Sequence, residues 1–511
     1  MRHVSPRRVR QRSAPGVALL RWLVALASLW AVTAHATQLD LAGCVELALA
    51  RNPQVLDAID AEESARVRLE VAELEFDLQV TPTIDGGVQG SNSTNQNFEL
   101  LLRRKFLPTG TQVDVKGSSR VFSTVPQVSV PYFSEARVTV AQPLFRGWTG
   151  IENRAGLNEA EHRVLSSEHA VEVAREDTVL QIVRAYYEIV RAEQLLEVAR
   201  RSLARVRDLK RSAEARLKLG KVSKMDVYRA ELQEARVQNT LADQESRRAT
   251  ALDQLKLQLG LDPRIDLQID PRLQGPSVTD LKRADLEHQA GTRRAEVREA
   301  RAEVADSERK LVLARYGLWP SVDLVGYYAQ QGFGDSFGDS FNLDRTEWNV
   351  GFRSSVPLDR TVQKAALTEA EIALRSRERL LRRLRGQVVG QVREAVRRLE
   401  RAQAESELAA RVAEQAAQQE ELARYRYEKG LTDNFDLMQA EEQLTEARAA
   451  RILAAIDRAV SAATVRRATG TLTEAFVAAD GPPAPPEPEP RLLDTAPESC
   501  ATGGTECAPA D

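Results

Sequence analysis

Residues 430–443, GLTDNFDLMQAEEQ, interrupt two very long charged, alanine-rich segments, and a similar stretch occurs earlier as residues 220–233, GKVSKMDVYRAELQ. The two stretches lie 210 positions apart and share a glycine, an aspartate and an Ala-Glu-x-Gln motif. A repeat of this kind predicts one structural unit that is built twice. The aligned pairs are Gly220 and Gly430, Asp226 and Asp436, Ala230 and Ala440, Glu231 and Glu441, and Gln233 and Gln443.

Long segments with heptad spacing flank both turns, which predicts antiparallel coiled-coil hairpins. We expect a helix over 147–219, a tip turn at 220–226 and a return helix to 261, then a second long helix to 429, a tip turn at 430–436 and a return helix to 470. A helix over 147–219 would be about 110 Å long. The expected core positions are Ile182, Ala185, Ile189, Ala192, Leu196, Ala199, Leu203, Val206, Ala213 and Leu217, and the residues 210 positions after each, with polar breaks at Lys210 and Glu420.

The remaining sequence divides around these hairpins. Residues 1–36 contain six arginines, an apolar run and an Ala-His-Ala site, as in a secretory signal peptide. The first repeat covers 37–262, a linker 263–281, the second repeat 282–475, and a proline-rich tail, predicted to be disordered, 476–511. The formal charge of −3 becomes −9 without the six arginines, so the mature chain is acidic, which argues against nucleic acid as a partner.

Alternating segments at about 81–143 and 320–357 predict membrane strands. Trp348, Val350 and Phe352 share one face, whereas Glu347 and Asn349 lie on the other, as in an outer-membrane strand. Four strands per chain are too few to close a barrel, so we expect oligomerisation, with three copies giving twelve strands. An additional hairpin in the first repeat either extends outward or adds strands. The alternative is a soluble periplasmic coiled-coil adaptor or scaffold with the segments as soluble hairpins.

The sequence resembles the TolC-like outer-membrane efflux proteins over residues 39–472. The resemblance rests on LDLAGCVELALARNPQV (39–55), AQPLFRGW (141–148), the paired tip turns and the two-fold repeat. It implies a mainly helical homotrimer, with a long antiparallel coiled-coil α-barrel joined to a twelve-stranded transmembrane β-barrel in the outer-membrane lipid of a Gram-negative bacterium. It also implies a passive conduit through the periplasm that works with a periplasmic membrane-fusion adaptor and an inner-membrane pump or ABC exporter, in efflux or type I secretion.

The resemblance places the periplasmic gate at the second tip. Asp436 and Asp226 match the family's tip aspartates, and Gln439 replaces a second family aspartate, which makes the predicted entrance less negative. For both aspartates, capping of the return helix is an alternative role. Gly220 and Gly430 are expected helix C-caps. The expected adaptor contacts are Arg216, Leu217, Arg426, Tyr427 and Leu431.

No catalytic, phosphate-binding or zinc motif is present, so we expect neither an enzyme nor a cofactor. His162 and His169 lie seven positions apart on a charged helix, which favours a solvated face over a metal site. Cys44 stands in a lipobox-like LAGC, but the helical pattern around it favours a small buried residue over a lipid anchor. Cys500 and Cys507 are a possible disulfide pair.

Overall fold

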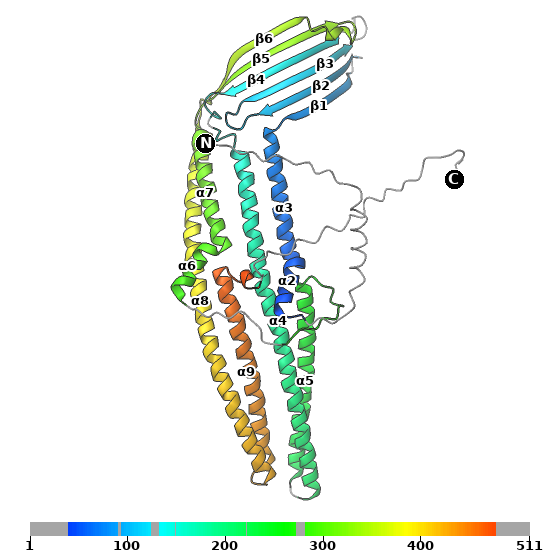
Figure 1. The fold of residues 1–511 in the computed structure, drawn as a ribbon, viewed down its shortest axis with the longest axis vertical. Coiled ribbons are helices and arrows are strands. Elements are labelled where there is room, and N and C mark those ends of the chain that lie inside the picture. Colours follow the sequence, from blue (N-terminus) through cyan, green and yellow to red (C-terminus); the bar gives the residue numbers. More distant parts are fainter. Residues whose placement is uncertain are drawn as a thin grey trace, which may run out of the picture.

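The computed structural model describes residues 39–89, 93–123, 132–148, 150–220, 222–271 and 282–476. The expected signal peptide 1–36, most of the linker 263–281, and the tail with Cys500 and Cys507 lie outside the described residues. Figure 1 shows an elongated molecule in which a sheet at one end continues into long helices that end in two tips.

Two helical hairpins form the long part of the molecule. The first pairs α4 (Ala155–Lys218) with α5 (Lys224–Gln258), and the second pairs α8 (Thr361–Glu428) with α9 (Asn434–Thr469). With 64 and 68 residues, α4 and α8 are each about 100 Å long. The expected heptad core is confirmed, because Ile182, Leu196, Val392 and Leu399 are all buried.

The start of the first long helix differs from the prediction. The helix was expected from residue 147, but α4 begins at Ala155, and turns and bends occupy residues 144–148 and 150–154. Gly147 and Gly150 have φ values of 98° and 70°, and side-chain-bearing residues avoid such angles. These turns redirect the chain from the sheet into the helix.

Shorter helices pack beside the hairpins between the sheet and the middle of the molecule. They are α2 (Leu41–Arg51), α3 (Pro53–Glu73), α6 (Arg283–Arg293) and α7 (Ala295–Tyr316), with the 3-10 turns η1 (Leu74–Phe76), η2 (Asp339–Phe341) and η3 (Thr473–Ala475). The main core lies where α2, α4, α5 and α9 meet, around the fully buried Tyr186 and Tyr187. No helix among the described residues is both long enough and apolar enough to cross a bilayer.

One antiparallel sheet contains the six strands that the structure describes, in the order β1–β2–β3–β4–β5–β6. Their bounds are β1 Gln79–Gln89, β2 Ser93–Lys105, β3 Gln112–Ser123, β4 Tyr132–Pro143, β5 Ser321–Gly334 and β6 Arg345–Ser355. The additional hairpin of the first repeat therefore adds β2 and β3 to the sheet. The expected four strands per chain are wrong for this protein, because its described residues form six, and three copies no longer predict twelve.

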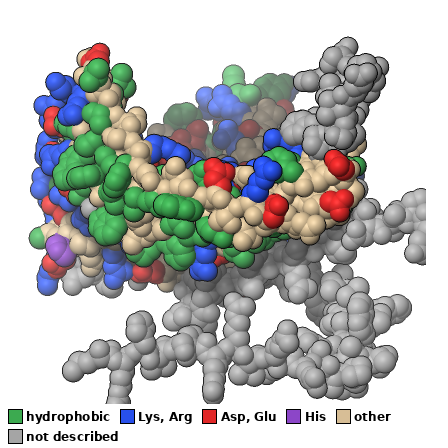
Figure 2. Space-filling view, turned by 90° about the horizontal axis from the view of Figure 1, so that it is seen from above, with side chains coloured by type: hydrophobic (Ala, Val, Ile, Leu, Met, Phe, Trp, Pro, Cys, Tyr) green, Lys and Arg blue, Asp and Glu red, His purple; other side chains and the backbone are tan. Residues whose placement is uncertain are grey.

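The two faces of this sheet differ in polarity. Register places Val115, Val138, Tyr328 and Trp348 in one row across neighbouring strands, and all four are exposed. Hydrophobic side chains gather along the outside of the curved sheet when it is viewed from above (Figure 2). The opposite face carries ion pairs, such as Arg103 with Asp114. Side chains that point to alternate faces of each strand produce this separation.

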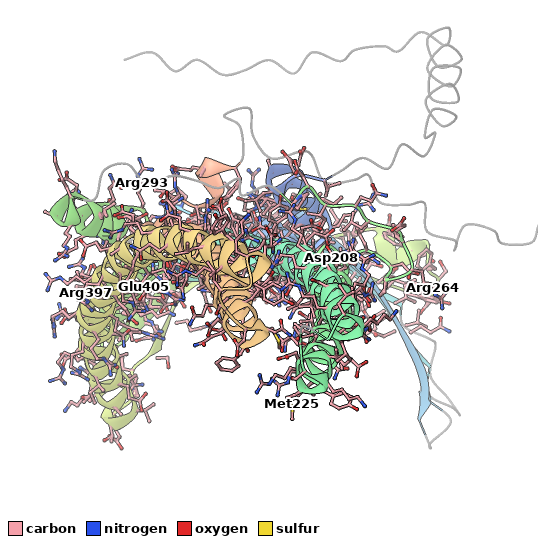
Figure 3. The ribbon with its side chains drawn as sticks, turned by 90° about the horizontal axis from the view of Figure 1, so that it is seen from below. Asp208, Met225, Arg264, Arg293, Arg397 and Glu405 are labelled. Atoms are coloured by element: carbon pink, nitrogen blue, oxygen red, sulfur yellow. The ribbon has the colours of Figure 1, made fainter. Side chains whose placement is uncertain are left out.

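The long helices follow a curved line. Seen from below, they succeed one another as α8, α9, α4 and α5 (Figure 3). The contact between α4 and α9 joins the two hairpins, and the pairing of β4 with β5 joins the two repeats in the sheet. One chain therefore forms an arc that is open at both ends.

Candidate channel gate at the helix tips

The first tip is closed by a glycine and a capping box. Gly220 has φ 70°, and its N–H donates to Leu217 O at 2.9 Å. Ser223 is the N-cap of α5, and its backbone N–H donates to Asp226 Oδ2 at 2.9 Å, while Asp226 N donates to Ser223 Oγ at 3.4 Å. These reciprocal bonds satisfy free donors at the helix start. Asp226 therefore caps α5.

The second tip uses different groups for the same geometry. Gly430 has φ 73°, and the N–H groups of Gly430 and Leu431 donate to Tyr427 O and Arg426 O at 3.0 and 2.9 Å, which is a Schellman motif. Asp433, rather than Asp436, is the N-cap of α9. The exposed Asp436 accepts a hydrogen bond from Thr432 Oγ1, which leaves its carboxylate at the surface of the tip.

Direct contacts hold the two tips together. Arg216 Nη1 donates to Tyr427 O at 3.0 Å, and its guanidinium lies 4.2 Å from the centre of the Tyr427 ring. Asn434 Nδ2 donates to Asp226 O at 3.1 Å, and only 2% of Asn434 is exposed. Tyr427 also packs between Leu209 and Leu437. The ends of the hairpins therefore form one packed unit within a chain.

A buried ion network joins the hairpins about three turns behind the tips. Arg205 of α4 donates from Nε to Glu441 Oε2 of α9 at 2.5 Å. Arg424 of α8 donates from Nη2 to Glu441 Oε1 at 2.8 Å and to Glu420 Oε1 at 2.6 Å. Burial raises the pKa of Glu441, and the hydrogen bond from Arg205 opposes this rise. The carboxylate therefore depends on both guanidinium groups for its charged form.

The repeat explains why this network crosses between hairpins. In the first hairpin Lys210 lies 3.7 Å from Glu231, so the opposite charges of these two residues compensate each other within the hairpin. The aligned positions of the second hairpin are Glu420 and Glu441, which repel each other. Arg424 relieves part of that repulsion, and Arg205 of the first hairpin supplies the remaining cation. The second hairpin is thus electrostatically incomplete without the first.

The predicted site residues are distributed between the surface and the contact of the tips. Asp436, Gln439, Arg426 and Leu431 are exposed, and Leu431 reaches 73% exposure. Leu217 and Arg216 are half-buried, whereas Tyr427 is only 4% exposed and faces the neighbouring hairpin. Their roles in gating and adaptor contact remain predictions.

The sequence did not identify Arg205, Asn434 or Arg424 as functional residues. One feature of the sequence pointed to the arginines. The first repeat has Lys210 facing Glu231, whereas the aligned residues of the second repeat, Glu420 and Glu441, are both negatively charged. A buried pair of acidic residues on facing helices requires a cation from elsewhere. That reasoning indicates an arginine but does not identify it, because Arg205 lies 236 positions from Glu441.

The histidines require a correction. His162 and His169 were expected on a solvated helix face, but their side chains are 9% and 8% exposed and face α7. Both pair with glutamates of that helix. Cys44 is fully buried in α2, as expected, and burial, with a smaller effect of Asp40, raises the pKa of its thiol to about 12.

Comparison with known proteins identifies the family. The model of the family "Outer membrane efflux protein" matches residues 44–261 and 286–471, one match in each repeat. This chain belongs to the outer membrane efflux protein family. Protein CyaE of Bordetella pertussis is 26% identical to it over 349 residues, which cover 68% of this chain and 72% of the relative.

Solved structures show the same fold for this outer membrane efflux protein. The CmeC outer membrane channel of Campylobacter jejuni has a TM-score of 0.66 and 15% identity, covering 84% of this chain and 86% of CmeC. The outer membrane protein VceC of Vibrio cholerae has a TM-score of 0.64 and 19% identity, covering 84% and 96%. The fold is a TolC-like channel fold, mainly helical with an antiparallel sheet and two internal repeats, and the family is one of channels rather than enzymes.

Proposed function

We propose that this efflux protein is the passive outer-membrane conduit of a tripartite efflux or type I secretion system. The observation that carries the proposal is a curved sheet with one apolar and one charged face, continuous with an arc of helices about 100 Å long. An apolar band suits lipid, and a charged inner face suits a water-filled lumen. The helices would then extend into the periplasm of a Gram-negative cell.

The lateral edges support closure by further copies of the chain. In the described residues β1 and β6 each pair with one neighbour, so both sheet edges keep free backbone groups, which lipid does not tolerate. Below the sheet, exposed apolar side chains lie along the end of α3 and the residues after it on one side, and along the start of α8 and the residues before it on the other. They are Val67, Val71, Leu74 and Leu78 on the first side, and Leu358, Val362, Ile372 and Leu380 on the second.

Three copies complete the proposed assembly, as the family resemblance implies. With the six strands that the described part of each chain contributes, a trimer has an eighteen-stranded barrel, an even number within the range of bacterial outer-membrane barrels. Barrel diameter grows roughly linearly with strand number, so this barrel is about one and a half times as wide as a twelve-stranded one.

The tip provides the proposed gate. Arg205, Arg424 and Glu441 hold the second hairpin against the first, and the opening of the conduit requires that these contacts separate. An adaptor that engages the exposed Leu431 and Arg426 would favour separation, with energy supplied by an inner-membrane pump or ABC exporter. Tyr427 and Arg216 become available to the adaptor only after their contact with each other breaks.

The exposed tip carboxylates set the charge of the proposed entrance. Three copies of Asp436 would form a negative ring that concentrates cations and repels anions. Asp226 would contribute less, because its carboxylate is engaged in the capping box. Gln439 adds no charge.

Conductance measurements test this proposal. We expect Asp436→Ala to leave assembly intact and to raise single-channel conductance or reduce cation preference in planar bilayers. Asp243→Ala is the matched control, since Asp243 is an exposed aspartate of α5 that pairs only with Arg247 on its own helix. Unchanged conductance and selectivity in Asp436→Ala would remove Asp436 from the gate. Recovery of wild-type protein in the soluble periplasm would instead favour the adaptor function.

A further inference from the structure

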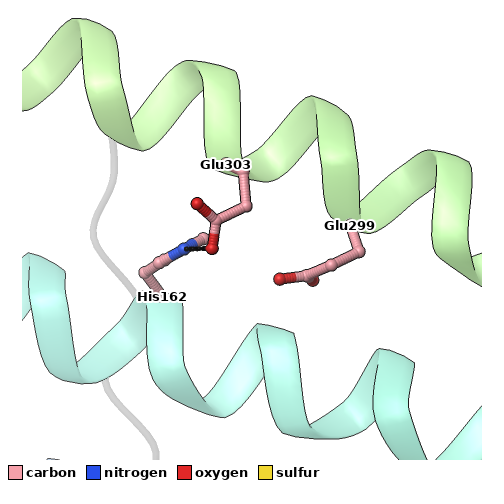
Figure 4. A group of neighbouring side chains, drawn as sticks. All are labelled: His162, Glu299 and Glu303. Carbon is pink, nitrogen blue, oxygen red and sulfur yellow. Dashed lines mark hydrogen bonds and ion pairs between the residues drawn. The ribbon is translucent and has the colours of Figure 1, made fainter. Parts of the chain in front are cut away.

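Two histidines and two glutamates meet between α4 and α7. His162 Nε2 of α4 lies 3.4 Å from Glu303 Oε1 of α7, and His169 Nδ1 lies 2.8 Å from Glu299 Oε2. Figure 4 shows His162 from one helix opposite Glu299 and Glu303 from the other. The helices belong to different repeats, and the cluster lies within a single chain, so it does not depend on the proposed trimer.

The spacing of three of these groups fits a metal ion. One ligand atom from each of His162, Glu299 and Glu303 lies within 4.8 Å of the other two. In a tetrahedral zinc site with bonds of about 2.0–2.1 Å, ligand atoms lie about 3.3 Å apart. The distance of 3.4 Å between His162 Nε2 and Glu303 Oε1 matches this value, whereas the ligand atom of Glu299 lies within 4.8 Å of the other two.

The surroundings position these ligands. Glu299 and Glu303 are four residues apart and therefore project from the same side of α7. The hydrogen bond from His169 to Glu299 leaves the second oxygen of that carboxylate for a metal, as in sites whose ligands are held by outer partners. The side chains of His162 and His169 are about nine-tenths buried, which limits the number of rotamers they sample.

Neighbouring cations occupy some of the carboxylate oxygens around the cluster. Asp306 is already neutralised by Arg309 and Lys310 at 3.1 and 2.8 Å, so it is not a ligand. Arg377 of α8 approaches Glu303 Oε2 at 3.4 Å, but Oε1 faces His162. Arg377 therefore competes for Oε2 of Glu303, whereas Oε1 stays directed toward His162.

We propose that His162, Glu299 and Glu303 bind a divalent transition-metal ion of the zinc class, with His169 as a positioning residue and water in the fourth position. Imidazole and carboxylate are the ligand types that such ions accept. The ion would fasten α4 of the first repeat to α7 of the second. The site is separate from the proposed gate at the helix tips.

Metal titration of the untagged, detergent-solubilised protein tests the site. Co²⁺ is the probe, because a tetrahedral Co²⁺ site absorbs visible light, and Zn²⁺ is the competitor. We expect one Co²⁺ per chain, displaced by Zn²⁺, with at least tenfold weaker binding in His162→Ala and Glu303→Gln. His169→Asn should weaken binding about 10- to 100-fold while the visible band persists at high Co²⁺. Arg377→Ala should bind at least as tightly as wild type.

Two controls make the result specific. His288→Ala removes an exposed histidine of α6, and Glu308→Gln changes an exposed glutamate of α7 outside the cluster. Both should bind Co²⁺ as wild type does. The proposal fails if wild-type protein binds no stoichiometric Co²⁺ at micromolar concentration. It also fails if binding survives in the nearly isosteric Glu299→Gln and Glu303→Gln variants, which are expected to fold normally.

Discussion

Single glycines determine the direction of the chain at both tips. Gly220 and Gly430 have φ values near 70°, and an added Cβ would meet no atom within 4 Å at either position. Glycine is therefore needed at these two positions for its backbone conformation, and not because a side chain would collide with a neighbour. A residue with a side chain costs about 1–2 kcal/mol in the left-handed region.

We predict that Gly430→Ala lowers stability by about 1–2 kcal/mol, because alanine must adopt the left-handed conformation. The measurement is the midpoint of thermal unfolding, followed by far-ultraviolet circular dichroism at a fixed scan rate. Gly386→Ala, in the interior of α8 where an added Cβ also meets nothing, is the control and should be neutral or stabilising. Equal effects of the two substitutions would contradict the explanation.

The sequence predicted these glycines because a helix C-cap is a local feature. It could not predict Asn434, whose side chain satisfies the carbonyl of Asp226 from 208 positions away. The heptad spacing likewise identified the buried Ile182 and Leu399 but not the partner of Glu441. Local periodicity identifies which face of a helix is buried, whereas the fold decides which side chains meet there.

At the scale of elements, the two hairpins depend on each other unequally. The first hairpin balances Lys210 with Glu231 and Glu234 by itself. The second needs Arg205 from α4 to compensate Glu441. An arginine that bridges hairpins should therefore affect the gate more than an arginine that bridges helices within one hairpin.

We predict that Arg205→Ala raises the fraction of time for which the channel is open in planar bilayers, because Glu441 of the second hairpin loses the cation that Arg205 of the first hairpin supplies. Arg207→Ala is the control, since Arg207 is two residues away on α4 and pairs with Glu234 of the same hairpin at 3.1 Å. The fraction of time for which the Arg207→Ala channel is open should equal that of wild type. A closed Arg205→Ala channel with intact assembly would show that the buried ion network does not hold the gate.

A second ion network connects the start of α7 with the end of α9. Glu296 accepts hydrogen bonds from Arg294 and Arg467, both at 2.9 Å. Burial alone would raise the pKa of Glu296, but the hydrogen bond from Arg294 and the charge of Arg467 outweigh it and lower the pKa to about 2. The shift from 4.5 corresponds to about 3 kcal/mol of folding free energy.

Because this pKa is lowered by folding, its stabilisation is complete above pH 4.5 and is lost as the pH falls toward 2. We predict that Glu296→Gln lowers the midpoint of thermal unfolding at neutral pH. The difference between the unfolding midpoints at neutral and acidic pH should be smaller in Glu296→Gln than in wild type. Glu308→Gln, an exposed neighbour on α7, is the control. If acid lowers the unfolding midpoint equally in wild type and Glu296→Gln, other carboxylates cause the loss of stability at low pH.

Element boundaries were predictable where turn chemistry is local. Strand pairing was not, because the alternation of Val113 and Val115 is the same in a barrel strand and in a projecting hairpin. The structure resolves the choice through register, which places Val115 opposite both Leu102 and Val138. A hairpin that projected from the sheet would lack the second of these pairings.

The whole described chain is an arc with two open sides. We predict that electron cryo-microscopy of the purified assembly in lipid nanodiscs shows three copies and eighteen strands. The physical reason is that six strands per chain leave both edges of the described sheet unpaired. A twelve-stranded barrel in the trimer, with β2 and β3 outside the wall, would contradict this assembly.

The pairing of β4 with β5 has a consequence for biogenesis. These strands belong to different repeats, and the entire first hairpin separates them in the chain. During synthesis one edge of β4 therefore stays unpaired until β5, residues 321–334, has been made. Unpaired strand edges of this kind promote aggregation. We therefore expect that the early strands need shielding by chaperones until the second repeat supplies β5, and that insertion of the sheet follows this pairing.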